Sequence, residues 1–164
     1  KNNRIVINNG IDKLPKNYLH IGNLLKIFPA SKVIHIQRDE WDNATSLFKQ
    51  RYIKNVPFSS SFFKIAVQMA NKNYMVDFWK KKLPNYIYDV EYEKLVADKE
   101  DQIKKIINFC GLEWDEKCLR PHINSKTPIK TVSISQARQP IYKTSLNSSD
   151  NYNEYLEKMY SILN

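Results

Sequence analysis

The chain of 164 residues carries 26 Lys and Arg against 17 Asp and Glu, a formal net charge of +9, and is long enough for the single domain that we expect over residues 1–164. The positive charge favours an anionic partner, a nucleotide or a nucleic acid equally, and no stretch approaches the ~20 consecutive apolar residues of a membrane span. Two cysteines, Cys110 and Cys118, are too few for a disulfide framework, which favours a reducing, cytoplasmic location.

The first half of the chain predicts strands alternating with helices. Residues 5–7 read as a short strand before a turn, and Pro15 favours the first turn of a helix that runs toward Phe28. The mainly apolar residues 32–37 predict a second strand. Asp39 is then a good N-cap for a helix of about ten residues.

The second half predicts a long helix over residues 58–83, a strand over residues 86–90 and a helix that Asp98 caps and Gly111 ends. The long helix ends in three lysines, which complement the helix dipole. A short helix over residues 153–163 closes the chain. The apolar residues that recur at helical spacing in the long helix are Phe62, Ala66, Met69, Val76 and Leu83. Because strands alternate with helices, we expect an α/β fold with a parallel sheet.

Arg38 and Ser46 are the first candidate site residues. Arg38 follows the predicted strand at residues 32–37, and the carboxyl ends of such strands are where open α/β sheets bind ligands. A guanidinium group matches a phosphate in shape and charge, and a hydroxyl on the following helix supplies a further hydrogen bond. Taken alone, the pair is more often structural, with Arg38 bonded to a nearby acid and Ser46 solvated.

Further motifs accompany this pair in a fixed order. The chain reads Asp-Lys-Leu-Pro from Asp12, Val-Glu-Tyr-Glu-Lys-Leu-Val from Val90, Phe-Cys-Gly-Leu-Glu-Trp from Phe109 and Ser-Ile-Ser-Gln-Ala-Arg-Gln-Pro-Ile-Tyr from Ser133. In this order and spacing, residues 11–145 resemble the sulfotransferases that use 3′-phosphoadenosine-5′-phosphosulfate (PAPS). The likeness is greatest to the bacterial branch often fused to tetratricopeptide repeats, and the tyrosylprotein sulfotransferases are more distant.

The resemblance implies a three-layer fold like that of P-loop NTPases, a parallel sheet flanked by helices. It also implies transfer of a sulfuryl group from PAPS to an acceptor hydroxyl or amine, with release of adenosine 3′,5′-bisphosphate. The family binds the 5′-phosphosulfate in a glycine-rich loop. The chain has three glycines, Gly10, Gly22 and Gly111, and none belongs to such a loop. We therefore expect the chain to be the C-terminal part of the domain, with the phosphate-loop strand upstream.

The resemblance also implies roles for single residues. Lys13 matches the lysine that approaches the bridging oxygen and the sulfonate, and the general base is expected upstream of residue 1. Arg38 and Ser46 match the pair that binds the 3′-phosphate, and Tyr92 matches the tyrosine near the adenine. Arg138 lies in a stretch that resembles the family's terminal segment, which closes over the 3′-phosphate side of the nucleotide, and Ser135 is implied as a donor to the sulfonate or a phosphate.

Two other classes of function stay open. A basic nucleic-acid-binding domain should gather its Lys and Arg with stacking aromatics on one face, whereas here they spread over all helices, so we expect no nucleic-acid partner. The second is a nonenzymatic interaction module with the same fold and nucleotide pocket. His20, His35 and His122 show no zinc-like spacing, so we expect no metal, and His35 reads as a hydrogen-bonded core histidine. The sequence identifies neither the acceptor nor the oligomeric state.

Overall fold

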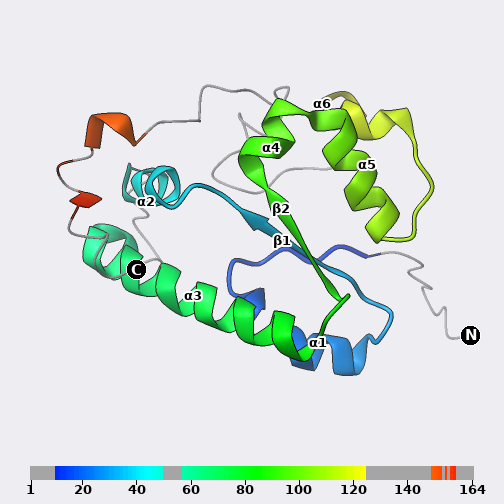
Figure 1. Ribbon diagram of the computed structural model, residues 1–164, viewed down its shortest axis with the longest axis horizontal. Coiled ribbons are helices and arrows are strands. Elements are labelled where there is room, and N and C mark those ends of the chain that lie inside the picture. The colour runs from blue at the N-terminus through cyan, green and yellow to red at the C-terminus, as the bar shows by residue number, and fades with distance from the viewer. Residues whose placement is uncertain (1–9, 50–56, 125–148, 153, 155, 158–164) are drawn as a thin grey trace, which may run out of the picture.

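The computed structural model describes residues 10–49, 57–124, 149–152, 154, 156 and 157. In this part of the chain, helices alternate with two strands (Figure 1). The elements in chain order are η1 (Asn17–Leu19), α1 (Ile21–Ile27), β1 (Val33–Gln37), α2 (Glu40–Lys49), η2 (Pro57–Ser60), α3 (Phe62–Lys82), β2 (Ile87–Glu91), α4 (Tyr92–Ala97), α5 (Lys99–Phe109), η3 (Glu116–Leu119), α6 (Pro121–Asn124) and η4 (Asp150–Tyr152).

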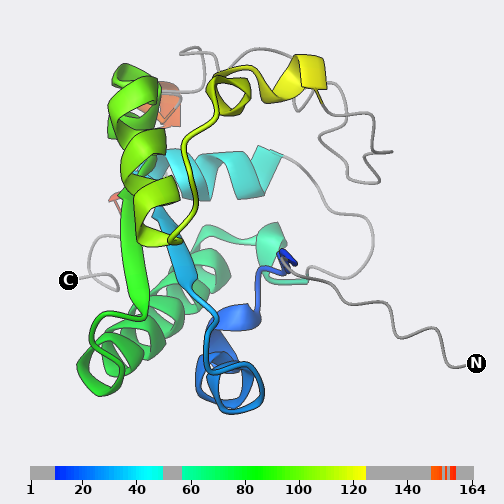
Figure 2. The same ribbon diagram turned by 90° about the vertical axis from the view of Figure 1, so that its right-hand side faces the viewer.

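The strands β1 and β2 pair in parallel, with α2 and α3 forming the connection between them (Figure 2). In the register of the pair, His35 lies opposite Asp89 and Gln37 opposite Glu91. The parallel arrangement confirms the prediction from the alternating pattern. Because both strands end at the same edge, the residues that follow them are brought together there.

Helices lie on both sides of this pair, with α3 on one side and α5 on the other (Figure 1). Tyr88 of β2 stacks on Phe109 of α5 at a centroid distance of 5.1 Å, whereas Asp89, its neighbour on β2, bonds to Lys80 of α3. Successive side chains of a strand point to opposite faces, which explains the difference. The α/β class is confirmed; the three-layer P-loop arrangement of a larger sheet stays a prediction, since the described residues contain two strands.

The main core lies between α2 and α3. Its buried members are Ala44, Ile65, Ala66, Met69 and Leu156, and partly buried aromatic residues pack around them. Each fully buried large apolar side chain contributes about 1.5–3 kcal/mol to stability. The core therefore fixes α3 against the helix that directly follows β1.

The other end of α3 is held by a close approach to α1. The indole N–H of Trp79 donates a hydrogen bond of 2.8 Å to the carbonyl oxygen of Tyr18, and the Trp79 ring lies over Gly22. A Cβ atom at Gly22 would stand 2.5 Å from that ring, so this position requires glycine. The sequence pattern did not predict this contact.

The predicted helix caps are confirmed. Asp39 Oδ1 accepts the backbone N–H of Asp42 at 2.9 Å, and Asp98 Oδ1 accepts that of Asp101 at 3.3 Å. Gly111 has a φ of 69° just after α5, the left-handed conformation expected of a helix stop.

Several helices differ from the prediction. The helix expected from Pro15 to Phe28 is divided into η1 and α1, because the backbone of His20 (φ −119°, ψ 9°) interrupts it. The long helix begins at Phe62, after the short turn η2, rather than at residue 58. The helix α4 directly after β2 was not predicted at all.

Some predictions fall outside the described residues. These are the strand at residues 5–7, the segment with Ser135 and Arg138, and most of the helix at residues 153–163, of which residues 154, 156 and 157 are described and helical. Among the described helices, none combines the length and apolar character needed to cross a bilayer.

Candidate functional site

Arg38 and Tyr92 meet at the carboxyl edge of the β1–β2 pair. Arg38 directly follows β1, and Tyr92 directly follows β2. The guanidinium carbon of Arg38 lies 5.4 Å from the centroid of the Tyr92 ring, a cation–π distance. In the same place the backbone N–H of Asp39 donates to Glu93 Oε1 at 3.0 Å, which ties the end of β1 to α4. Two sequence-predicted residues, 54 positions apart in the chain, are therefore neighbours.

Asp42 also holds Arg38. Its carboxylate lies 3.6 Å from Arg38 Nη2, and it is almost fully buried, at 2% exposure. The other carboxylate oxygen accepts the backbone N–H of Ser149 at 2.9 Å. A buried carboxylate with a cationic partner and a backbone donor is well satisfied, so Asp42 fixes the direction of the arginine. The sequence analysis did not single out Asp42, although its spacing of four residues from Arg38 is the spacing of a helical ion pair.

Ser46 lies one turn after Asp42 on the same face of α2 and is half-buried. Asp42 and Ser46 therefore follow one another along one side of α2, and Arg38, which precedes the helix, is joined to Asp42. The binding of a phosphate by Arg38 and Ser46 stays a prediction. Lys13 is exposed in the segment before η1, where Asp12 accepts a hydrogen bond from the side-chain amide of Asn17 at 2.9 Å. In the described part of the chain, no hydrogen bond or ion pair joins Lys13 to the Arg38 group.

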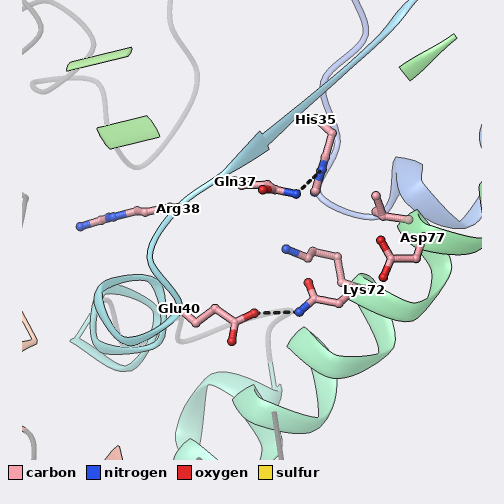
Figure 3. A pocket seen from close by; sticks show the side chains of 8 residues that line it. His35, Gln37, Arg38, Glu40, Lys72 and Asp77 are labelled. Carbon is pink, nitrogen blue, oxygen red and sulfur yellow. Dashed lines mark hydrogen bonds between the residues drawn. The ribbon is translucent and has the colours of Figure 1, made fainter. Parts of the chain in front are cut away.

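A pocket of about 280 Å³ opens between β1, the start of α2, and α3 (Figure 3). Its lining is mostly polar or charged, and the side-chain amide of Asn73 donates to Glu40 Oε1 at 2.7 Å across it. The lining residues are His35, Gln37, Arg38, Glu40, Lys72, Asn73, Val76 and Asp77. Arg38 thus belongs both to the edge site beside Tyr92 and to the rim of this pocket.

His35 is the inner end of a polar network beside the pocket. Its Nδ1 lies 2.8 Å from Asp89 Oδ1, and Lys80 Nζ lies 2.6 Å from Asp89 Oδ2. Burial lowers the pKa of His35, the hydrogen bond that His35 donates to Asp89 opposes this shift, and the charge of Lys72 adds to it. Burial alone would raise the pKa of Asp89, but hydrogen bonds from Lys80 and His35 lower it.

The network fixes the protonation of His35. An ionised Asp89 is an acceptor only, so the neutral imidazole carries its proton on Nδ1 and leaves a lone pair on Nε2. That Nε2 atom is buried and has no hydrogen-bond partner in the described part of the chain. The predicted hydrogen bond of His35 is confirmed, but the side chain is partly buried and lines the pocket rather than lying in the core. The three lysines at the end of α3 were interpreted as a solvated helix terminus, or alternatively as facing an acidic acceptor; one of them, Lys80, is the partner of Asp89.

The described residues contain no group of three His, Cys, Asp or Glu side chains that could hold a metal ion. What the arrangement offers instead is fixed cations and hydrogen-bond donors. Arg38 is held between a ring and a carboxylate at a strand end, and Lys72 lines the adjoining pocket. Such a surface is suited to binding anionic groups.

Comparisons with known proteins indicate which family this chain belongs to. A family model described as "Sulfotransferase family" matches residues 2–116. An uncharacterized protein of Aquifex aeolicus is 32% identical over 156 residues, which cover 93% of this chain and 20% of that protein. The omega-hydroxy-beta-dihydromenaquinone-9 sulfotransferase Stf3 of Mycobacterium bovis is 27% identical over 119 residues, 68% of this chain and 30% of that protein, and the Mycobacterium tuberculosis protein of the same name matches equally. The chain thus spans less than a third of the length of these relatives.

Proposed function

Because the chain belongs to the sulfotransferase family, we propose that it forms part of an enzyme that transfers a sulfuryl group from PAPS to an acceptor hydroxyl or amine and releases adenosine 3′,5′-bisphosphate. The observation that carries the proposal is the contact of Arg38 with Tyr92 at the carboxyl edge of two parallel strands. Ligands of open α/β sheets bind at this edge. Residues 1–164 would then belong to one sulfotransferase domain.

In this proposal Arg38 and Ser46 bind the 3′-phosphate, and Tyr92 lies near the adenine. Arg38 suits the role because the Tyr92 ring and the buried Asp42 carboxylate restrict its side chain before any ligand arrives. A donor that is already oriented loses less entropy on binding. Ser135 and Arg138 would add contacts from the segment that follows.

Sulfuryl transfer needs cations and donors around the moving group more than covalent chemistry from the protein, as in phosphoryl transfer. Lys13 is our candidate for that part, since it is exposed at the start of the described residues and is not held by an ion pair there. It would lie near the bridging oxygen and the sulfonate. The general base and the 5′-phosphosulfate loop would come from residues upstream of residue 1.

The test is transfer of radiolabelled sulfate from PAPS by the full encoded protein to a panel of phenols, sugars and peptides. We expect turnover with some of these acceptors, and we expect Lys13→Ala to lower kcat by about 10²–10³, the loss typical of one transition-state donor. Nucleotide affinity should change much less. Lys26→Ala, which removes an exposed lysine of α1, is the matched control and should leave kcat unchanged.

Two outcomes would count against the proposal. Binding of adenosine 3′,5′-bisphosphate with no transfer to any acceptor would support a nonenzymatic module of the same fold. A Lys13→Ala variant that binds PAPS poorly but turns over normally at saturation would make Lys13 a binding residue only.

A further inference from the structure

Lys72 reaches from α3 into the pocket, and its ammonium group points toward the space between Gln37 and Glu40 (Figure 3). In the described part of the chain, no hydrogen bond or ion pair engages this group. Burial lowers the pKa of Lys72, although the charge of Glu40 opposes the shift. A partly desolvated cation without a partner is costly, so its presence calls for an explanation.

The nearby carboxylates are already occupied. Glu40 Oε1 accepts the amide of Asn73 at 2.7 Å, and Asp89 is bonded to Lys80 at 2.6 Å. Asp77 lies 4.0 Å from Lys80 as well. Glu40 attracts Lys72 from beyond ion-pair distance, but none of these groups neutralises it by contact. The charge of Lys72 is therefore directed at the pocket rather than at the protein.

Gln37 provides a second donor at the same place. Its side-chain nitrogen lies 3.5 Å from His35 Nδ1, which carries a proton because it donates to Asp89. Figure 3 draws this contact as a dashed line, but at 3.5 Å and with the Nδ1 proton given to Asp89 it does not engage the amide N–H groups of Gln37, which remain for the pocket that this residue lines. His35 Nε2 is buried and does not take part.

We propose that Lys72 and Gln37 bind an oxyanion group of a small-molecule ligand, a carboxylate, phosphate or sulfate, in this pocket. The ammonium supplies the charge and the amide a neutral donor, and about 280 Å³ leaves room for part of the molecule that carries the group. The oxyanion could belong to the nucleotide or to the acceptor. Tyr92, which we propose lies near the adenine, does not line this pocket, and this favours the acceptor as the source; the assignment of source rests on the proposed function.

The experiment follows the side-chain NMR signals of Lys72 in the full encoded protein, and the side-chain amide signals of Gln37 report binding in the variants that lack Lys72. Inorganic phosphate is titrated first alone and then with adenosine 3′,5′-bisphosphate at saturation, so that the Arg38 site is filled. An anion beside Lys72 favours its charged form, so we expect its pKa to rise and its signals to shift at millimolar phosphate. We expect Lys72→Met to weaken the binding of phosphate to the nucleotide-saturated protein about tenfold or more, the effect of losing a charged hydrogen bond.

Controls separate a site from a general charge effect. Lys64→Met removes an exposed lysine from the same helix and should change phosphate binding less than about twofold, while Lys72→Arg keeps the charge and should retain part of the affinity. Shifts of Lys72 by phosphate in the presence of the nucleotide support an acceptor-side anion site. Shifts caused by the nucleotide itself, which then excludes phosphate, support the site and assign it to the donor. Shifts with neither ligand, or equal losses in Lys64→Met, overturn the proposal. Nucleotide binding is recorded separately, so failure of the proposed function is distinguishable.

Discussion

The two faces of the β1–β2 pair are built on different principles. Toward α5, Tyr88 stacks on Phe109, and Val90 is 1% exposed. Toward α3, His35 and Asp89 face each other across the strands and are completed by Lys80. The apolar face tolerates any packing that excludes water, whereas each polar group on the other face needs one particular partner.

The difference between the two faces explains why the pocket lies on the α3 side of the strand pair. A face built from hydrogen-bonded polar groups can line a pocket with donors and charges, and the pocket beside β1 lies on the α3 side of the pair. The apolar face contributes stability and holds the strands in register. The edge shared by both faces carries Arg38 and Tyr92, each fixed by the strand that it follows.

The largest effect should come from a charge placed on the apolar face. Val90→Asp buries a carboxylate without a partner, and we expect it to lower the free energy of unfolding by about 4 kcal/mol or more. Ile36→Asp is the matched control: it lies on the same face but is 58% exposed, so its cost should stay within about 1 kcal/mol. Urea unfolding of both variants measures the difference. A loss for Val90→Asp as small as that expected for Ile36→Asp would mean that Val90 is not buried.

The placement of α3 against the polar face depends on Gly22. We expect Gly22→Ala to lower the free energy of unfolding by about 1–3 kcal/mol, because its Cβ atom would clash with the Trp79 ring. Thermal unfolding of the variant is the measurement. An ordinary glycine within a helix behaves in the opposite way, since alanine there stabilises by about 1 kcal/mol. A rise in stability would therefore rule out the close approach.

The polar face should make stability depend on pH. Because the pKa of His35 lies below its usual value of 6.5, the unfolded chain takes up a proton before the folded one as the pH falls. The free energy of unfolding should therefore fall below about pH 6.5, by at most about 1.4 kcal/mol per pH unit. Asp89, with a pKa below 3.8, adds a further loss only under more acid conditions.

Chemical unfolding at a series of pH values checks this dependence. His35→Gln should remove the slope just below pH 6.5, and His20→Gln, which changes an exposed histidine, should keep it. An unchanged slope in His35→Gln would show that another group causes it.

Local features of the fold were predictable from the sequence. The caps at Asp39 and Asp98 and the stop at Gly111 depend on residues within one turn, so spacing alone locates them. The proximity of Arg38 and Tyr92 follows from one further assumption, that the strands before them are parallel neighbours. Such strands end at the same edge of the sheet and bring the residues that follow them together.

The remaining features depend on contacts between distant segments. The bond of Lys80 to Asp89, the packing of Trp79 on Gly22 and the link from Asp42 to Ser149 each join residues that no local pattern associates. The partial burial of Lys72 beside the pocket could not be predicted either, because a lysine on a helix is usually solvated. Such contacts are decided by how the helices pack, and they also shape the pocket.

The most direct test of the proposed nucleotide site is calorimetric titration of the full encoded protein with adenosine 3′,5′-bisphosphate and with adenosine 5′-monophosphate, which lacks the 3′-phosphate. Hydrogen bonds to a charged group contribute about 1.5–3 kcal/mol, so Arg38→Ala should weaken binding of the bisphosphate about tenfold or more. Binding of the monophosphate should barely change, and Lys64→Ala should affect neither ligand. Equal losses for both nucleotides, or no loss for either, would contradict the assignment of Arg38 to the 3′-phosphate.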